Sequence, residues 1–269
     1  MTGIITEIQR FSLNDGDGIR TTVFFKGCNL ACKWCHNPET LDTKPTLLSY
    51  PEKCIGCHHC AEGCPTGAKT ISGREISVDE VMREVLQDRA YYENSNGGVT
   101  LSGGEVMCQP EFAKELALAC KSAGISVGVE TNLSLPWERM QPVLELCDLV
   151  MCDLKLADSD EHRLWTGVGN ERILENLEKL AATGKKWILR TPLIPGATDT
   201  DNNIGSIAEI ASRLCPDSWE LLNYNPLGGA KYKAMGLVNK FADAVPLGRK
   251  RLDELRKIAA RSGRKVVIA

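Results

Sequence analysis

Strand-like and helix-like segments alternate from about residue 97 to the end of the chain, and this alternation constrains the fold more than any other feature. Apolar and β-branched runs at 98–103, 125–131 and 148–155 are typical of buried strands. The segment 110–124 begins at a proline and ends at a glycine, as helices commonly do. Because repeated strand–helix units produce a parallel sheet, we predict an α/β fold with ligands at the carboxyl ends of its strands.

The number of strand–helix units is smaller than a closed barrel requires. Two strands, at 6–12 and 20–27, come first, and a capping box of Ser77 and Glu80 predicts a helix from 78 to about 90. A complete eight-unit barrel takes about 250 residues, and part of this 269-residue chain belongs to an insert. About six units remain, which fits a barrel with a missing side or an open doubly wound sheet. We predict the first, a partial (β/α)6 TIM-like barrel with a lateral opening.

Composition and charge exclude several classes of protein. The formal net charge is −3, so a basic surface for nucleic acid is not expected. No apolar run reaches the roughly 18 residues of a membrane span. The first residues lack the basic start and apolar core of a secretory signal. The sequence thus predicts a cytoplasmic protein with no nucleic-acid or membrane partner, whose clustered cysteines are metal ligands rather than disulfides.

The cysteines of the chain number 12, and 7 of them lie between residues 28 and 64 in two groups with metal-ligand spacing. The remaining cysteines are scattered along the chain, and we expect each to be a small buried apolar residue. They are Cys108, Cys120, Cys147, Cys152 and Cys215.

Residues 41–75 interrupt the alternation and contain the second cysteine group. So short a segment cannot build a sufficient core alone, and a bound cluster would supply the missing stability. The group matches the C-x2-C-x2-C-x3-C-P run of bacterial ferredoxins, with Cys54, Cys57, Cys60 and Cys64 before Pro65. We predict one auxiliary [4Fe–4S] cluster, with Cys64 as its fourth ligand. Two alternatives stay open: a corner taken by His58 or His59, or a zinc site.

These patterns divide the chain into two parts. Residues 1–40 and 76–269 are predicted to form the partial barrel, and residues 41–75 a ferredoxin-like iron–sulfur insert.

The first cysteine group has only three members, Cys28, Cys32 and Cys35, spaced C-x3-C-x2-C. A structural zinc site requires four protein ligands, and His36 follows Cys35 directly, which makes convergence on one metal awkward. A three-thiolate [4Fe–4S] cluster would instead leave one iron free to bind a substrate.

With Trp34 just before its last cysteine, this run resembles that of the radical S-adenosylmethionine (radical SAM) enzymes. The resemblance implies that SAM binds the free iron through its amine and carboxylate, and that one electron breaks its sulfonium carbon–sulfur bond. The products are methionine and a 5′-deoxyadenosyl radical, which abstracts a hydrogen atom. The resemblance assigns cofactor contacts to two segments, one with Trp34, His36 and Asn37, the other with Ser102, Gly103, Gly104 and Glu105.

Further motifs resemble the activating enzymes of glycyl radical enzymes. They are DGDGIRTTVFFKGC, CHNPET, ETN, DLVMCDLK, LIPG and LLNYNPLG, and they run in order from about residue 5 to the end of the chain. The resemblance implies an anaerobic oxidoreductase that abstracts hydrogen from one glycine of a separate glycyl radical enzyme. It implies a flavodoxin or a ferredoxin as electron donor. Asp15 then belongs to the leader that meets the substrate loop.

The same resemblance assigns roles to residues at later strand ends. Glu130, Thr131, Asp153 and the carbonyl of Met151 match a site for a monovalent cation, Na⁺ or K⁺, beside the cofactor. Lys155 and Arg190 match residues near the cofactor carboxylate, which an arginine binds in bidentate fashion.

Two positions on the adenine side differ from the others. Asn225 stands where relatives have a cofactor-contacting histidine, so adenine contacts do not transfer directly. Tyr224 and Tyr232 are either core residues or neighbours of the adenine.

Three other functions compete with activation. A radical SAM enzyme that acts on a small molecule would carry the same first cysteine group. An electron carrier with two clusters would not need the GGE segment or the cation-site residues. A zinc-stapled interaction protein would contain neither iron nor acid-labile sulfide.

Overall fold

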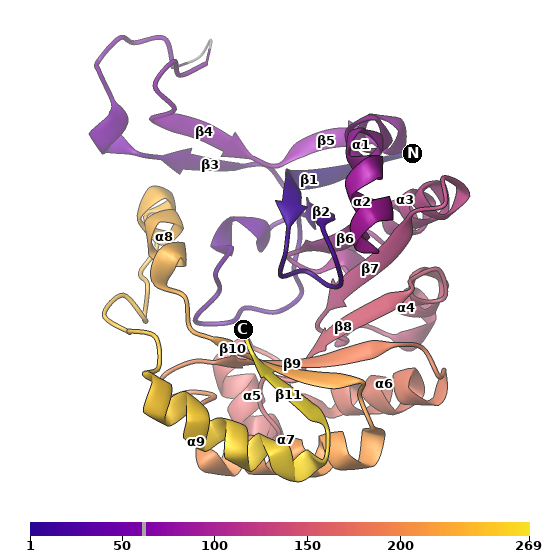
Figure 1. The fold of residues 1–269 in the computed structure, drawn as a ribbon. Coiled ribbons are helices and arrows are strands. Elements are labelled where there is room, and N and C mark those ends of the chain that lie inside the picture. Colours follow the sequence, from indigo (N-terminus) through magenta and orange to yellow (C-terminus); the bar gives the residue numbers. More distant parts are fainter. Residues whose placement is uncertain (61–62) are drawn as a thin grey trace.

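The computed structural model describes residues 1–60 and 63–269, and over these ranges the main sheet has nine strands in the order β11-β10-β9-β8-β7-β6-β2-β1-β5 (Figure 1). The strands are β1 (Thr2–Ser12), β2 (Arg20–Phe25), β5 (Arg74–Ser77), β6 (Gly98–Gly103), β7 (Ser126–Thr131), β8 (Leu149–Asp153), β9 (Trp187–Leu193), β10 (Ser218–Asn223) and β11 (Lys265–Ile268).

Neighbouring strands from β2 to β11 run parallel, and β1 lies antiparallel between β2 and β5. Within the described ranges β11 pairs only with β10 and β5 only with β1, so the sheet does not close. The α/β prediction is confirmed, and the open, parallel-rich sheet is consistent with a partial barrel.

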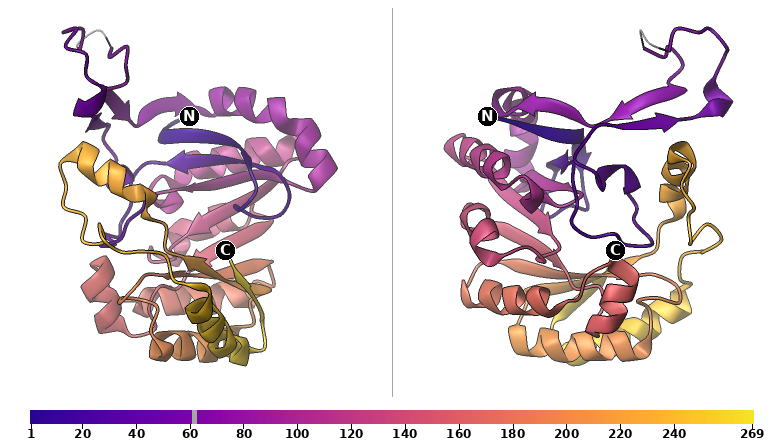
Figure 2. Two further views of the ribbon diagram at one scale, coloured as in Figure 1. Left: turned by 60° about the vertical axis from the view of Figure 1, so that its left-hand side comes forward. Right: turned by 180° about the vertical axis from the view of Figure 1, so that it is seen from behind.

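Helices cover the outer face of the sheet, where Figures 1 and 2 show α3, α4, α6 and α7. The helices are α1 (Val78–Val85), α2 (Arg89–Ser95), α3 (Pro110–Ser122), α4 (Trp137–Leu144), α5 (Ser159–Thr166), α6 (Glu171–Ala182), α7 (Asp201–Leu214), α8 (Gly229–Met235) and α9 (Arg249–Ala259). In the described part of the chain no helix is both long and apolar enough to cross a membrane.

The two faces of the sheet differ in chemistry because successive side chains of a strand point to opposite sides. Val99, Leu101 and Val129 belong to the main apolar core. Alternate residues on the same strands, such as Thr100 and Glu130, face the inner side with polar groups that bond Asp15 and Arg190. The outer face therefore stabilises the fold, and the inner face is left for chemistry.

The predicted helix at 78–90 is interrupted. Its capping box is confirmed, since Glu80 N donates to Ser77 Oγ at 3.3 Å and Ser77 N donates to the Glu80 carboxylate at 2.8 Å. A 3-10 turn at Leu86–Asp88 then separates α1 from α2. The interruption lets the buried Asp88 carboxylate accept hydrogen bonds from Arg10 and Thr21, and these bonds tie the helices to β1 and β2.

Between β2 and β5 the chain forms an antiparallel hairpin of β3 (Thr46–Ser49) and β4 (Lys69–Ser72), which extends away from the main sheet (Figures 1 and 2). Arg74 already pairs with Ile5 in the main sheet. The predicted insert 41–75 includes residues 61 and 62, which lie outside the described residues. Its ferredoxin-like character stays a prediction.

The scattered cysteines follow the prediction in part. Cys120, Cys147 and Cys152 are buried, Cys108 is half-buried and Cys215 is exposed. The prediction for Cys215 is wrong because this residue ends α7 in the left-handed conformation (φ 56°), at the surface rather than in the core.

Candidate active site

A cleft of about 600 Å³ lies at the carboxyl ends of the parallel strands, where open α/β sheets bind ligands. Most of the predicted site residues line it together: Asp15, Cys28, Cys32, Trp34, Cys35, His36, Asn37, Gly103, Gly104, Glu130, Asp153, Lys155, Arg190 and Asn225. These residues come from segments spread over 211 positions of the sequence, from 15 to 225.

Other predicted residues lie elsewhere. Ser102, Glu105, Thr131 and Met151 are buried and are not part of the lining. The second cysteine group lies in the hairpin loop, also away from this lining.

The loop that carries the first cysteine group is fixed by backbone hydrogen bonds to three neighbours. Gly27 N donates to Thr40 O at 2.7 Å, and Glu105 N donates to Gly27 O at 2.8 Å. Ala31 N donates to Thr166 O at 2.8 Å, at the end of α5. Gly27 has φ 102°, and a Cβ atom there would lie 2.7 Å from Thr43, so only glycine fits. The fold therefore determines where this loop presents its thiols.

Glu105 connects the end of β6 to the end of β7. Its buried carboxylate accepts hydrogen bonds from Met107 N at 3.0 Å, Thr131 Oγ1 at 2.9 Å and Asn132 N at 2.7 Å. Burial raises the pKa of Glu105, and these donors oppose that shift. In this structure the side chain holds the strand ends together, while Gly103 and Gly104 line the cleft.

A chain of charges crosses the inner face of the sheet. The Arg190 guanidinium contacts Glu130, bonds Glu220 at 2.8 Å and donates to Asn14 O at 2.8 Å. Burial alone would lower the pKa of Arg190, but the two carboxylates outweigh it and raise the pKa. Burial raises the pKa of Glu130 despite its arginine partner. Arg190 therefore stays protonated and connects β7, β9, β10 and the leader.

A second charge pair lies on the β8 segment. Lys155 Nζ is 2.5 Å from the Asp153 carboxylate. Burial opposes the charged form of Lys155, yet Asp153 and the nearby Cys32 raise the pKa of the ammonium group. The structure thus places a fixed cation and an anion beside the cysteine loop.

The donor set at the first cysteine loop fits an iron–sulfur cluster. Burial raises the pKa of Cys35 to about 12 and also raises the pKa of Cys28 and Cys32, so an uncompensated thiolate is costly until a metal neutralises it. In residues 1–60 and 63–269, no three His, Cys, Asp or Glu side chains lie close enough to hold a single ion. Three thiols on one short loop suit a cluster that spreads its ligands over several irons.

Helix α8, which sequence reasoning missed, covers the cysteine loop. Lys231 donates to Asn37 Oδ1 and to Glu39 Oε1, both at 2.6 Å. A Cβ atom on Gly228 would lie 3.1 Å from His36 O, so the backbones are nearly in contact. Within residues 1–60 and 63–269, the other carboxylate oxygen of Glu39 is buried and has no hydrogen-bond partner. The Lys231–Glu39 pair therefore holds α8 against the loop.

An aromatic group forms part of the cleft lining, through Trp34 and Tyr224. Trp34 packs against Trp165 and Phe241 with ring centroids 6.1 and 6.3 Å apart. Tyr224 packs on Phe241 and donates from its hydroxyl to Phe241 O at 3.0 Å. Tyr224 therefore belongs to a small core and also lines the cleft.

The leader between β1 and β2 is held against the inner face. Asp15 accepts a hydrogen bond from Thr22 at 2.7 Å through its carboxylate, and from Thr100 at 2.6 Å through its carbonyl. Arg20 is almost wholly buried and donates to Val99 O at 2.6 Å and Thr100 Oγ1 at 2.7 Å. The arginine of the leader motif thus anchors the segment that carries Asp15.

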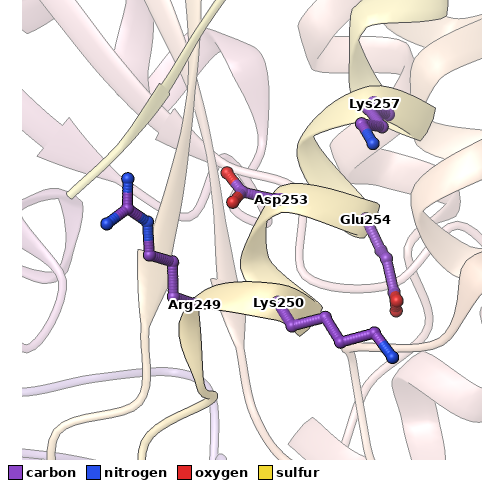
Figure 3. Close-up of a pocket in the computed structure, with 5 residues that line it drawn as sticks. All are labelled: Arg249, Lys250, Asp253, Glu254 and Lys257. Carbon is purple, nitrogen blue, oxygen red and sulfur yellow. The ribbon is translucent and has the colours of Figure 1, made fainter.

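A second cleft, of about 450 Å³, lies on α9 at the outer surface (Figure 3). Charged side chains of that one helix line it, namely Arg249, Lys250, Asp253, Glu254 and Lys257. None of the predicted site residues is among them, so the first cleft is the candidate active site.

Comparison with known proteins agrees with this arrangement. The family model for the radical SAM superfamily matches residues 22–204. The chain is 39% identical to the (2S)-3-sulfopropanediol dehydratase activating enzyme of Klebsiella oxytoca over 277 residues, 88% of this chain and 87% of that protein. It is 38% identical to the pyruvate formate-lyase 2-activating enzyme of Escherichia coli (strain K12) over 267 residues, 98% of this chain and 91% of that protein.

A solved structure gives the same result. The crystal structure of a domain of pyruvate-formate lyase-activating enzyme from Bacteroides vulgatus matches with a TM-score of 0.55 and 29% identity, over 64% of this chain and 99% of that one. The chain therefore belongs to the radical SAM superfamily and, within it, to the glycyl radical enzyme activating enzymes. Membership implies SAM and a [4Fe–4S] cluster as cofactors.

Proposed function

We propose that this enzyme activates a partner glycyl radical enzyme by removing a hydrogen atom from one glycine of that protein. The observation that carries the proposal is the shared cleft. Cys28, Cys32 and Cys35 line it together with Gly103, Gly104, Lys155 and Arg190. Thiols for a cluster and groups for an amino-acid carboxylate therefore face one space, as SAM binding requires.

In this proposal the chain's own residues bind and orient. The three thiols would hold the cluster, Trp34, His36 and Asn37 would flank SAM, and the strand end at Ser102–Glu105 would receive its methionine amine. Lys155 and Arg190 supply positive charge for its carboxylate, and Asn225 lies at the rim. When bound, the cluster and SAM supply a 5′-deoxyadenosyl radical. The aromatic group around Trp34 excludes water from that part of the cleft.

The open side of the sheet supports a protein substrate. A partial (β/α)6 barrel leaves its β11 and β1–β5 edges apart, and the leader with Asp15 lies beside the cleft. An extended protein segment reaches a reactive group more readily through an open side than through a closed barrel. We propose that Asp15 contacts the segment that carries the glycine.

We further propose a second [4Fe–4S] cluster in the insert 41–75, held by Cys54, Cys57, Cys60 and Cys64, with residues 1–40 and 76–269 as the catalytic domain. The supporting observation is the ferredoxin spacing on a loop of a separate two-stranded sheet. A flavodoxin or ferredoxin would deliver the electrons.

The proposed Na⁺ or K⁺ site uses Glu130, Thr131, Asp153 and the Met151 carbonyl. Glu130 lies opposite Met151 in the β7–β8 register, and Thr131 lies opposite Cys152. Both carboxylates already have side-chain cation partners, Arg190 and Lys155, so an alkali cation would have to share them. Comparing SAM cleavage in Na⁺, K⁺ and tetramethylammonium buffers tests this site.

Anaerobic mixing of the reduced enzyme with SAM and candidate partners tests the function. We expect 5′-deoxyadenosine release and a glycine-centred doublet in the electron paramagnetic resonance spectrum. Release that depends on a small molecule, with no doublet on any protein, would contradict the proposal.

A further inference from the structure

Three large apolar side chains are exposed where the leader begins. Phe11 is 47% exposed, Leu13 is 69% exposed and Tyr91, on α2, is 45% exposed. We call Phe11, Leu13 and Tyr91 the leader patch. Single exposed apolar residues are common on proteins, so the patch requires a further reason to be considered functional.

The backbone at Phe11 supplies that reason. Gln9 pairs with Thr22 and Ser12 pairs with Arg20, so β1 has one more residue than β2 between these pairs, which is a β-bulge. Phe11 adopts φ 59° in this bulge. A bulky residue in the left-handed region is a genuine outlier that costs about 1–3 kcal/mol and persists only where its surroundings enforce it.

Two neighbouring side chains contact the Phe11 ring, which stays half exposed. The Phe11 ring packs edge-on against Tyr91 with centroids 4.7 Å apart. The Arg10 guanidinium lies 5.6 Å from the same ring and bonds the buried Asp88 carboxylate at 2.8 Å. The protein thus holds a strained backbone in a conformation that leaves an aromatic ring accessible, whereas an ordinary strand pairing would avoid the strain.

The patch is continuous with the cleft along the chain. Leu13 is followed directly by Asn14 and Asp15, both of which line the cleft. Asn14 O accepts a hydrogen bond from Arg190 at 2.8 Å, and Asp15 is bonded to Thr22. The leader therefore connects the exposed patch rigidly to the position that the glycine must reach.

We infer that the leader patch is the docking surface for the glycyl radical partner, and that it binds apolar side chains beside the segment that carries the glycine. The inference rests on the proposed function. Phe11 and Tyr91 act as aromatic anchors, the kind of residue that dominates interface energies. The bulge keeps them preorganised, which lowers the entropy lost on docking.

The test uses Phe11→Asn and Leu13→Ser in the complete, cluster-loaded enzyme. Asparagine tolerates the left-handed backbone, so the ring is removed without disturbing the bulge. Leu118→Asn is the matched control, because Leu118 is exposed on α3, on the outer face of the sheet. The probes are the glycyl radical enzymes named by the two relatives, (2S)-3-sulfopropanediol dehydratase and pyruvate formate-lyase 2.

For each variant, formation of the glycine doublet is measured against partner concentration, and 5′-deoxyadenosine release is measured without partner. We expect the partner KM of Phe11→Asn and Leu13→Ser to rise about tenfold, or 1.4 kcal/mol, with partner-free release unchanged. Leu118→Asn should match the wild type. Wild-type activity with unchanged partner KM in both leader variants overturns the docking inference alone. A wild type that forms no doublet on these probes or on any other glycyl radical enzyme overturns the proposed function and this inference with it.

Discussion

The two cysteine loops carry the same kind of ligand on very different supports. The first loop is bonded to the end of β6, to α5 and to the 3-10 turn at Pro38–Thr40, and α8 covers it. The second loop extends from a two-stranded hairpin, and its Cys54 and Cys60 are exposed. The fold itself positions the thiols of the first loop. The positions of the thiols in the second loop would depend on the cluster that they would bind.

The pKa values of the thiols also differ between the two loops. Burial raises the pKa of Cys35 to about 12. The Thr66 hydroxyl, 3.5 Å from the Cys64 sulfur, together with nearby backbone N–H groups, lowers the pKa of Cys64 to about 7. The thiols of the first loop are thus protected, and Cys64 is reactive near neutral pH.

The largest effect is expected at the first loop. Replacing Cys28, Cys32 or Cys35 with alanine should abolish 5′-deoxyadenosine release, because a cluster with two thiolates is not held in the cleft. Release is measured by chromatography after anaerobic reduction with dithionite. The exposed Cys215→Ser is the control, and robust release by any of the three alanine variants would contradict the site assignment.

The second-largest effect is expected in how fast the thiols of the two loops react with an alkylating reagent. In cluster-free protein at pH 8, iodoacetamide should label Cys64 far faster than Cys35, because the thiolate fraction at that pH is about ten-thousandfold larger for a pKa of about 7 than for a pKa of about 12. The Cys64 rate should rise with pH through about 7. Peptide mapping by mass spectrometry checks both rates.

Thr66→Val removes one hydrogen bond to Cys64, so its labelling midpoint should move to higher pH. Equal labelling of both loops would show that the first loop is not protected by the fold.

A smaller loss is expected at the second loop. Cys54→Ala or Cys57→Ala should leave 5′-deoxyadenosine release with dithionite within about threefold of wild type, because the cleft is intact. Iron content, the thermal midpoint and the rate with a protein electron donor should fall. A variant with normal iron content and normal donor-driven activity would show that the insert is dispensable.

Sequence periodicity was sufficient for the elements of the parallel sheet, because strands such as β7 and helices such as α3 are long and end at recognisable residues. The cysteine spacing predicts the first loop, and the resemblance to the activating enzymes supplies most of the other lining residues. The helix α8 was missed because it has only seven residues, begins at Gly229 directly after Gly228, and shows little periodicity.

The tertiary contacts made by several predicted residues could not be found from the sequence. Glu105 was predicted as a cofactor contact, and its bonds to Thr131 and Asn132 depend on how β6 and β7 align. The ion pairs of Arg190 with Glu130 and Glu220 join three strands, and no local sequence pattern predicts them. The bulge at Phe11 likewise depends on strand register.

The smallest effect is expected at the α8 contact. Lys231→Met leaves both oxygens of the buried Glu39 carboxylate without a hydrogen-bond partner in the described part of the chain. Because Lys231 is 32% exposed, water screens the pair, and we expect a loss of only about 1–2 kcal/mol in the free energy of unfolding. Anaerobic urea unfolding measures it. The control is Lys233→Met on the exposed side of the same helix. Equal stabilities of the two variants would show that the Lys231–Glu39 pair does not stabilise the fold.

The most direct test of the division between the loops is electron paramagnetic resonance of the reduced enzyme with and without SAM. The protein is compared with a variant in which Cys54, Cys57, Cys60 and Cys64 are all alanine. SAM should change the cluster spectrum in that variant and in the wild type alike, because in the proposed arrangement only the cluster of the first loop would have an open iron. A spectrum that no longer responds to SAM, or a variant without any cluster signal, would contradict the account.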